Sequence, residues 1–531
     1  MPLSFGTAGI RGPMGSGEDG LNSTTVRQTA AGISSYLDAS LPHARARVVL
    51  GYDGRHHSED FARDSAGVFH AAGHAVFLLP GPLPTPVLAF AVRELDADAG
   101  LMITASHNPA TDNGIKVYLG GRLTDEHGRG AQIIPPVDAL IQEHIRSIAA
   151  PPAWASGWTL LDDGVEAAYV AAVAGLVPPV DDANRVRRAG FGIALTPLHG
   201  VGGATAFAIL ASAGFTVIHP VESQFTPDPD FPTTPYPNPE EAGVMDAAIA
   251  VAQKTASSIA LALDPDADRC GVAADLDGEW RMLTGNEVGD ILGDHVATRI
   301  TAGEHLPGTA PGARTLASSL VSSRRLAAIA GHHELPYTST PTGFKWLART
   351  PGLAFAYEEA LGYCVAPEIV RDKDGMSAAL VLVEALSIAR SEGSGVEHIL
   401  ATLDRMYGAF RSRLITIRTS TPKGARTALR AVEEHPPAVL GGARVLHAED
   451  LRAGVDGLPP TEGLRFSLDE GSRVIVRASG TEAKLKAYVE CFAPSDDQDG
   501  RAHAAARASA IATDIEHTLI AALGAIPLPD R

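Results

Sequence analysis

Three successive parts of this chain alternate short apolar runs, which predict buried strands, with longer stretches that predict helices. The first part contains a predicted helix over residues 25–37, and predicted strands over 47–53 and 75–79 with a helix between them. The alternation begins again near Gly190 and a third time near Arg314. Because strands that alternate with helices are typical of parallel sheets covered by helices, we expect an α/β architecture.

The pattern changes after about Arg411. Short runs there predict strands with few helices between them, at residues 414–418, 464–468, 473–477 and 485–491. This spacing favours an α+β domain on a largely antiparallel sheet. Since 531 residues are too many for one ordinary core, the length suggests three or four domains.

Charge and composition exclude several classes of protein. The chain carries 43 Lys and Arg against 62 Asp and Glu, a formal charge of -19, which disfavours a general role on nucleic acid or acidic lipid. The three cysteines, Cys270, Cys364 and Cys491, are far apart and lack CxxC spacing, so we expect neither a disulfide framework nor a zinc site. The chain has no signal-peptide pattern and no run near the ~20 apolar residues of a membrane span, so we expect a soluble, cytoplasmic protein.

A polar loop follows the apolar run 99–104 in the stretch LMITASHNPATDNGIKVY. Turn formers such as Asn108 halt the predicted strand, so Ser106 lies where the strand stops. Polar residues at strand ends of α/β sheets tend to face the crevice in which ligands bind, and His107 and Lys116 flank this serine. From the residues alone, a reactive serine and an ordinary surface turn both remain open.

A second polar loop follows the apolar run 258–263 and contains Asp264, Asp266, Asp268 and Arg269. Three carboxylates so close together repel one another, and a hard divalent cation such as magnesium is the usual compensation. Arg269 follows directly and would be held beside such a site. A solvated acidic turn is the alternative that the spacing leaves open.

Two glycine-rich turns could hold anions. Residues 5–12, FGTAGIRG, combine glycines with Arg11, and glycine permits the close backbone approach that anion-binding loops need. Residues 191–205, FGIALTPLHGVGGAT, place glycines after a predicted strand, with Glu222 about where the ribose-binding acid of a dinucleotide fold is expected. A dehydrogenase is therefore an alternative, although Thr205 replaces the last glycine of that fingerprint.

The third alternation offers polar groups for a sugar or a phosphate. Thr342, Gly343 and Lys345 form a predicted turn before a helix, where a backbone amide or the lysine could meet a hydroxyl or a phosphate. A predicted strand then ends in Glu358 and Glu359, which are either the start of a helix or a hydrogen-bonding pair for a polyol.

Two further stretches carry positive charge. Arg371 and Lys373, in RDKDG, lie either near this loop or in a surface turn before the apolar helix 377–388. The turn RASGTEAKLK joins the last two predicted strands and offers a guanidinium, two hydroxyls and exposed amides, which suit a phosphate. Its candidate ligands are Arg477, Ser479, Gly480 and Thr481.

Taken together, these motifs resemble those of the α-D-phosphohexomutase superfamily. FGTAGIRG, TASHNP, DPDADR, EEALG and RASGTE occur once each and in family order. EEALGY, RGPMGSG, DKDGMSAA and the proline-rich stretch 225–241 resemble the phosphoglucomutase branch that includes phosphopentomutases and glucose 1,6-bisphosphate synthases. The resemblance implies three similar α/β domains with mixed sheets and a smaller C-terminal α+β domain. The expected bounds are residues 1–155, 156–305, 306–410 and 411–531.

The resemblance also assigns roles. It implies that Ser106 carries the phosphoryl group being exchanged and that Arg11 lies against it. Magnesium would be bound by Asp264, Asp266 and Asp268 together with an oxygen of the phosphorylated Ser106. Lys116 and His107 would serve as general base and acid, with Arg11 and Arg269 in support. The substrate-binding residues would be Thr342, Gly343, Lys345, Glu358, Glu359, Arg371, Lys373, Arg477, Ser479, Gly480 and Thr481.

The implied activity is a phosphosugar mutase that interconverts a sugar 1-phosphate and a sugar 6-phosphate, with glucose favoured and a sugar 1,6-bisphosphate as intermediate and activator. Phosphomannomutase and phosphopentomutase activities are alternatives with the same mechanism. A sugar-phosphate phosphatase and a noncatalytic sugar-phosphate sensor are further alternatives. We expect a monomer or weak homodimer. Two positions depart from the family pattern: Ala360 stands where many glucose-type members have serine, and Ala483 stands where proline is usual.

Overall fold

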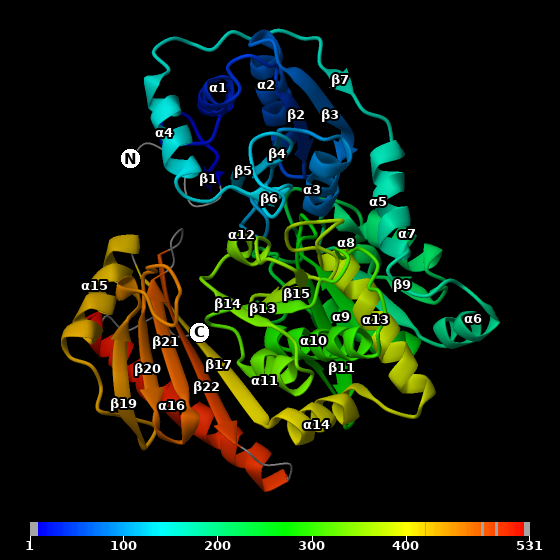
Figure 1. The fold of residues 1–531 in the computed structure, drawn as a ribbon, viewed down its shortest axis with the longest axis vertical. Helices are drawn as coiled ribbons and strands as arrows, with labels where there is room; N and C mark the ends of the chain where they lie inside the picture. The colour runs from blue at the N-terminus through cyan, green and yellow to red at the C-terminus, as the bar shows by residue number, and fades with distance from the viewer. Residues whose placement is uncertain (1–8, 420, 479–482, 494–497, 525–531) are drawn as a thin grey trace. The chain divides into compact units, whose positions relative to one another are not determined.

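The computed structural model describes residues 9–419, 421–478, 483–493 and 498–524. The chain forms two compact units, one of Met1–Ala317 with Gly343–Glu397 and one of Ser318–Thr342 with His398–Arg531. Figure 1 labels their elements. Within the described residues, no helix combines the length and the apolar character needed to cross a bilayer. Cys270, Cys364 and Cys491 are all buried and free.

The first unit begins with a mixed sheet whose main strand order is β1-β5-β4-β2-β3-β7, with β6 beside β5. Its strands are β1 (Gly9–Pro13), β2 (Arg47–Tyr52), β3 (Ala75–Pro82), β4 (Ala99–Ile103), β5 (Asp112–Leu119), β6 (Ala131–Gln132) and β7 (Thr159–Leu160). β4, β2, β3 and β7 pair in parallel, but β5 pairs antiparallel with β4 and with β1. The expectation of a parallel sheet is therefore wrong at this edge, because a short loop returns the chain directly from β4 into β5.

Helices cover both faces of this sheet. One face packs against α1 (Ser23–Ser40), α2 (Ser58–Ala71) and α4 (Val137–Ser147), and the other against α3 (Thr85–Glu94). The predicted helix 25–37 lies within α1, which begins at a capping box formed by Asn22 and Thr25. β2 and β4 are buried along almost their whole length, because successive side chains pack alternately against the helices on the two faces, as in other α/β domains.

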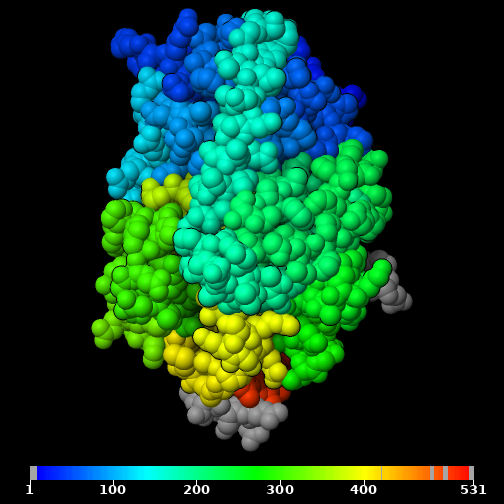
Figure 2. All heavy atoms as spheres, turned by 90° about the vertical axis from the view of Figure 1, so that its right-hand side faces the viewer, coloured from blue at the N-terminus to red at the C-terminus, as the bar shows by residue number. Residues whose placement is uncertain are grey.

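A segment whose only regular element is β7 joins α4 to α5 (Gly164–Ala174) and runs along the surface of the first domain, where Figure 2 shows it in cyan. Trp154 of this segment packs so closely on α2 that a Cβ atom at Gly67 would lie 2.0 Å from the Trp154 Nε1 atom. Trp154 thus holds this segment against α2.

The second sheet of this unit has the order β12-β11-β10-β8-β9, with parallel pairing only among β10, β8 and β9. Its elements are α6 (Asp182–Ala189), β8 (Ile193–Thr196), α7 (Gly202–Ser212), β9 (Ile218–Pro220), α8 (Glu222–Phe225), α9 (Asp246–Thr255), β10 (Ile259–Leu263), β11 (Cys270–Leu276) and β12 (Glu279–Met282). The long proline-rich stretch after Phe225 contains neither helix nor strand before α9.

A third group of elements completes the first unit. It comprises α10 (Gly285–Thr301), β13 (Thr315–Ser319), α12 (Phe344–Leu347), β15 (Leu353–Glu358), β16 (Gly362–Cys364) and α13 (Gly375–Ser391). β15 and β16 pair antiparallel, and their apolar residues pack with α12. The predicted strand before Glu358 and Glu359 and the predicted helix 377–388 are both present.

The second unit is dominated by an antiparallel sheet with the order β17-β22-β21-β20-β19-β18. Its elements are α11 (Arg325–His332), β14 (Tyr337–Thr340), α14 (Val396–Tyr407), β17 (Ala409–Arg418), α15 (Pro422–Glu434), β18 (Val439–Leu440), β19 (Ala443–Asp450), η1 (Leu451–Ala453), β20 (Leu464–Leu468), η2 (Asp469–Gly471), β21 (Arg473–Ala478), β22 (Lys484–Ala493) and α16 (Gln498–Ala522). The α+β prediction is correct. β18 and β19 are additional strands that the sequence pattern does not reveal.

Candidate active site

Ser106 lies in the loop between β4 and β5, as the end of the apolar run predicts. It is buried and adopts a left-handed conformation, with φ at 53°. Its backbone N–H donates to Thr104 Oγ1 at 2.9 Å. Its hydroxyl donates to Asp264 Oδ2 at 2.8 Å, and its Oγ lies 3.1 Å from His107 Nδ1. The serine therefore faces a carboxylate that lies 158 residues further along the chain.

Asp264, Asp266 and Asp268 lie in the loop between β10 and β11, and all three are buried. One carboxylate oxygen from each lies within 4.8 Å of the others, so the group could hold a metal ion. Thr85, at the start of α3, donates to Asp266 Oδ2 at 2.6 Å. The Oδ1 atoms of Asp266 and Asp268 are buried and have no hydrogen-bond donor among the described residues. Such oxygens are what a hard cation requires.

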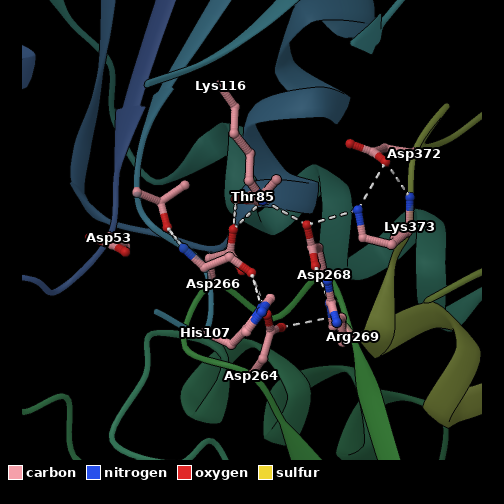
Figure 3. Close-up of polar contacts among 12 residues, drawn as sticks. Asp53, Thr85, His107, Lys116, Asp264, Asp266, Asp268, Arg269, Asp372 and Lys373 are labelled. Atoms are coloured by element: carbon pink, nitrogen blue, oxygen red, sulfur yellow. Dashed lines mark hydrogen bonds and ion pairs between the residues drawn. The ribbon is translucent and has the colours of Figure 1, made fainter. Parts of the chain in front are cut away.

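Lysines from two other elements balance this acidic loop, as Figure 3 shows. Lys116, on β5, donates to Asp266 Oδ2 at 2.5 Å and to Asp268 Oδ2 at 2.6 Å. Lys373, just before α13, lies 3.2 Å from Asp268 Oδ2 and 3.5 Å from Asp372 Oδ1. The sequence predicts both lysines near a polar loop but does not show that they meet at one carboxylate.

Burial and neighbouring charges together raise the pKa of the Asp264 carboxyl and lower that of the Asp268 carboxyl. Burial, reinforced by the charges of Asp266 and Asp268, raises the pKa of Asp264 well above its usual range. Burial also acts on Asp268, but there Lys116 and Lys373 prevail and hold its pKa far below the usual range. Burial opposes the charged form of Lys116, yet Asp266 and Asp268 raise the pKa of this ammonium. Lys116 is thus a cation that is paired with the acidic loop.

Arg269 and Arg11 border the same loop. The backbone N–H of Arg269 donates to Asp264 Oδ1 at 3.0 Å, and its Nε atom lies 3.9 Å from Asp268 Oδ1. Arg11 lies on β1 and donates to Asn108 Oδ1 at 3.2 Å in the serine loop. The structure thus places Arg11 beside the loop that contains Ser106, through its contact with Asn108.

The glycines after β8 accommodate the acidic loop. A Cβ atom at Gly200 would lie 2.3 Å from the Cα atom of Pro265, and one at Gly202 would lie 2.5 Å from the Cβ atom of Ala267. The space in which a dinucleotide-binding turn would admit a pyrophosphate is therefore occupied by the chain itself. Glu222 begins α8 rather than closing a strand. The dehydrogenase interpretation of this turn is wrong for these reasons.

The third group contributes Glu358 and Glu359 at the end of β15, both partly buried. Arg371 is buried and donates to the backbone oxygen of Ala348 at 3.3 Å, and it also pairs with Glu368. Lys373 approaches the stem of Glu358 closely enough that both side chains lie against Gly362.

Gly343 and Lys345 lie at α12. Gly343 has a φ of 108° and precedes the helix, and burial lowers the pKa of the Lys345 ammonium, which lies 5.6 Å from the ring centre of Trp346. Thr342 and Arg477 belong to the second unit, where the Arg477 guanidinium donates to Thr342 Oγ1. Ser479, Gly480 and Thr481 lie outside the described residues.

Thr85, Thr104 and Arg55 are buried, contact the site and were not among the sequence candidates. Thr85 bonds Asp266, and Arg55 bonds the backbone of the serine loop. Arg55 follows β2 by three positions, so the rule that strand ends face the site could have identified it.

The ionisation of Glu358 yields a testable pH dependence. Burial, opposed by Lys373 and reinforced by Glu359, raises the pKa of Glu358 from 4.5 to about 7. A raised folded-state pKa gives a stabilisation that is complete below the unfolded pKa and is lost as pH rises through the folded pKa, at most about 3 kcal/mol before solvent screening. We expect Glu358→Gln to raise the Tm relative to the unsubstituted protein more at about pH 8 than at about pH 5.

Thermal unfolding at both pH values checks this expectation, with Glu359→Gln as the matched loss of a neighbouring carboxylate. Equal Tm differences at the two pH values for Glu358→Gln would contradict it.

Four domain profiles of one protein family match successive parts of this chain. Profiles described as phosphoglucomutase/phosphomannomutase α/β/α domains I, II and III match residues 2–151, 167–277 and 285–406, and the C-terminal domain of that family matches residues 422–508. A Haemophilus influenzae protein named "Probable phosphomannomutase" is 39% identical over 89% of this chain and 93% of its own length. The chain belongs to the phosphoglucomutase/phosphomannomutase family.

Other members of this family carry different names. Mouse phosphopentomutase is 35% identical, with 94% of this chain and 85% of the mouse protein covered. A Staphylococcus epidermidis phosphoglucomutase is 32% identical, with 92% and 90% covered. The chain is thus a mutase of the α-D-phosphohexomutase superfamily, a class of isomerases. The names of its relatives refer to different sugars: mannose, pentose and glucose.

Solved structures of family members show the same fold. Parafusin, a phosphoglucomutase from Paramecium, matches with a TM-score of 0.73 at 18% identity and covers 98% of this chain and 95% of its own. A phosphoglucomutase/phosphomannomutase family protein from Burkholderia thailandensis matches with a TM-score of 0.71 at 20% identity, with 99% of both chains covered. The four-domain architecture, three α/β domains and a smaller C-terminal α+β domain, agrees with the expectation from the sequence.

Proposed function

We propose that this mutase interconverts glucose 1-phosphate and glucose 6-phosphate through a phosphoserine at Ser106 and a glucose 1,6-bisphosphate intermediate. The observation that carries the proposal is the meeting of Ser106 Oγ with the buried carboxylates, 2.8 Å from Asp264 Oδ2. A serine hydroxyl beside a cluster that could hold a metal ion is suited to exchange a phosphoryl group.

Asp264, Asp266 and Asp268 would hold Mg²⁺. Two of their buried oxygens have no donor among the described residues, and carboxylate oxygens are the ligands that magnesium prefers. When bound, the ion would neutralise negative charge on the phosphoryl group, which is the dominant contribution in phosphoryl transfer. Arg11 and Arg269 would add fixed positive charge on the protein side.

The transfer exchanges one phosphorus–oxygen bond for another. The free hydroxyl oxygen of the sugar monophosphate attacks the phosphorus on Ser106, the bond from phosphorus to Oγ breaks, and the hydroxyl proton must pass to a base. We assign the proton transfers to Lys116 and His107. Lys116 can accept a proton only when its contacts with Asp266 and Asp268 are broken, because both carboxylates raise its pKa. His107 Nδ1, 3.1 Å from Oγ, is placed to return a proton to the serine.

The substrate would be bound through its sugar hydroxyls and through its phosphate. Glu358 and Glu359 would accept hydrogen bonds from sugar hydroxyls, and the basic residues would bind phosphate. The proposed binding residues are Thr342, Gly343, Lys345, Arg371, Lys373, Arg477, Ser479, Gly480 and Thr481. The bisphosphate would turn over and return its other phosphate to Ser106, and added sugar 1,6-bisphosphate would restore the phosphoserine.

The expected domain bounds, residues 1–155, 156–305, 306–410 and 411–531, complete the proposal. They would place Ser106 in the first domain, the acidic loop in the second, Glu358 in the third and Arg477 in the fourth. We also propose a cytoplasmic protein, because three free, buried cysteines suit a reducing compartment. We propose a monomer or weak homodimer.

A pentose phosphate is the second candidate substrate. Relatives named phosphopentomutase and phosphoribomutase are 32% to 35% identical to this chain, comparable with the relatives named phosphoglucomutase. Ala360 lacks the hydroxyl that many glucose-type members place in the sugar loop. Mannose phosphate is a third candidate, favoured by the name of the Haemophilus relative.

The test compares kcat/KM for glucose 1-phosphate, mannose 1-phosphate and ribose 1-phosphate, with magnesium and a trace of sugar bisphosphate. We expect the highest value for glucose 1-phosphate and no net release of inorganic phosphate. A clear preference for ribose 1-phosphate would replace the glucose assignment with a phosphopentomutase. Stoichiometric release of inorganic phosphate would identify a phosphatase and overturn the mutase mechanism.

A further inference from the structure

The Arg55 side chain donates hydrogen bonds to the backbone of the serine loop. Its Nη2 atom donates to the carbonyl oxygens of Ser106 at 2.5 Å and of Asn108 at 2.6 Å. Its Nη1 atom donates to the carbonyl oxygens of Pro109 at 2.8 Å and of Asp112 at 3.1 Å. One buried guanidinium thus accounts for hydrogen bonds to four carbonyl oxygens within seven residues.

Two elements outside the serine loop fix Arg55. Its Nε atom lies 3.2 Å from Asp53 Oδ2, and the other oxygen of Asp53 accepts the Ser58 hydroxyl at 2.6 Å. The guanidinium also lies 4.9 Å from the ring centre of Phe231, which belongs to the proline-rich stretch. The side chains of Arg55 and Asp53 are each only 1% exposed. Asp53 and Phe231 therefore contact the Arg55 guanidinium from outside the serine loop.

The backbone of the proline-rich stretch is strained at Phe231, whose ring contacts Arg55. Phe231 is buried and has a φ of 45°, a conformation that costs a residue other than glycine of order 1–3 kcal/mol. Next to it, Asp230 Oδ1 lies 2.7 Å from His56 Nε2. Further along, Thr233 Oγ1 lies 2.8 Å from His199 Nε2. Neighbouring contacts therefore hold Phe231 in its strained conformation against Arg55.

Ser106 is also strained. Its φ of 53° is one that serine rarely adopts, and the surrounding structure must impose it. Thr104 holds its N–H and Arg55 holds its carbonyl oxygen, so both sides of the residue are fixed. A lysine at position 55 could not replace this grip, because its single ammonium group lacks the planar fork that lets arginine contact four oxygens.

We propose that Arg55 is a positioning residue that holds Ser106 in its strained conformation, with Oγ aimed at the acidic loop, and that Phe231 of the proline-rich stretch holds Arg55 in place. The proposal rests on the proposed role of Ser106 as the residue that carries the phosphoryl group. It adds the function of a stretch, residues 225–241, that the proposed chemistry does not otherwise use.

The test measures phosphoryl transfer to Ser106 directly. Dephosphorylated protein is mixed with glucose 1,6-bisphosphate and magnesium, and the phosphorylated fraction of the Ser106 peptide is followed over time by mass spectrometry. We expect Arg55→Lys to slow this transfer by about 10²-fold or more, since a misplacement of about 1 Å has an effect of that size. We expect kcat to fall by a similar factor while KM for glucose 1-phosphate changes little. Phe231→Leu should give a smaller loss in the same two quantities.

A structural role alone would act differently. The matched control is Arg122→Lys, because Arg122 also bonds a carboxylate, Asp98, and a backbone oxygen, that of Arg45, in the same domain. Hydrogen exchange supplies a second measurement, and we expect faster exchange of the amides of residues 104–112 in Arg55→Lys but not in Arg122→Lys.

The outcomes separate the two proposals. If the unsubstituted protein never gains a phosphoryl group on Ser106, the proposed function is wrong. If it does, and Arg55→Lys is phosphorylated as fast as the Arg122→Lys control, the positioning role is wrong. If Arg55→Lys fails to fold, Phe231→Leu, which leaves every hydrogen bond of Arg55 in place, decides the question by the same rate.

Discussion

Ser106→Ala is expected to reduce turnover of glucose 1-phosphate by about 10⁴-fold or more, the scale on which loss of a nucleophile acts in enzymes that use one. The hydroxyl is the only side-chain atom that Ser106 contributes to the site, and no substitution of a neighbour restores it. Alanine also removes the hydrogen bond to Asp264 Oδ2, so a modest decrease in Tm is expected. A coupled assay for glucose 6-phosphate measures the loss.

The matched control for this substitution is Thr111→Ala. Thr111 lies in the same loop, is exposed, and its hydroxyl donates only to Asp112 Oδ1 at 3.2 Å among the contacts described. It should retain turnover within a few-fold, as is usual for surface substitutions. Normal turnover by Ser106→Ala would refute the phosphoserine mechanism, whatever sugar the protein prefers.

Asp268→Asn is expected to have the second largest effect. Asp268 Oδ2 accepts a hydrogen bond from Lys116 at 2.6 Å and forms an ion pair with Lys373 at 3.2 Å. Its negative charge therefore holds two buried cations in place and also belongs to the proposed metal ligands. Loss of that charge should reduce kcat by about 10³-fold or more, because one donor in a preorganised site already contributes about 10²- to 10³-fold. A magnesium titration of activity should show no recovery in the variant.

Binding can be measured apart from activity. Magnesium should raise the Tm of the unsubstituted protein, since a ligand that binds only the folded state stabilises it, and this increase should vanish in Asp268→Asn. Asp277→Asn is the control, because Asp277 lies in the exposed turn after β11 with a φ of 58° that asparagine tolerates. An unchanged magnesium-dependent increase in Asp268→Asn would exclude this aspartate as a ligand. Removal of metal by a chelator should abolish turnover in a way that magnesium reverses.

The sequence predicts that Ser106 and Asp264 lie in loops after buried strands, which is where the structure places them. Asp264 follows β10 directly and Ser106 lies three residues after the end of β4, because polar residues come where an apolar run stops at the end of a strand. That both loops would face one another could not be derived from spacing. It depends on how two domains pack, and only the motif resemblance supplied it.

Other features were hidden for identifiable reasons. β1, GIRGP, has a single strongly apolar residue, so its pairing with β5 depends on a partner about a hundred residues away rather than on a local pattern. β19, ARVLHAED, is largely polar because most of its side chains are not buried. The position of Arg55 three residues after β2 points toward the site, but its hydrogen bonds to four carbonyl oxygens are not visible in the sequence.

The separation of 158 residues between Ser106 and Asp264 has a consequence for synthesis of the chain. Domains fold largely in order as they leave the ribosome, at about 5–20 residues per second, so about 8–32 s pass between the emergence of the serine loop and that of the carboxylates. Through that interval the newly made first domain has a core and a serine but no acidic loop facing it. Folding of this domain and the assembly of its chemistry are therefore separate events during translation.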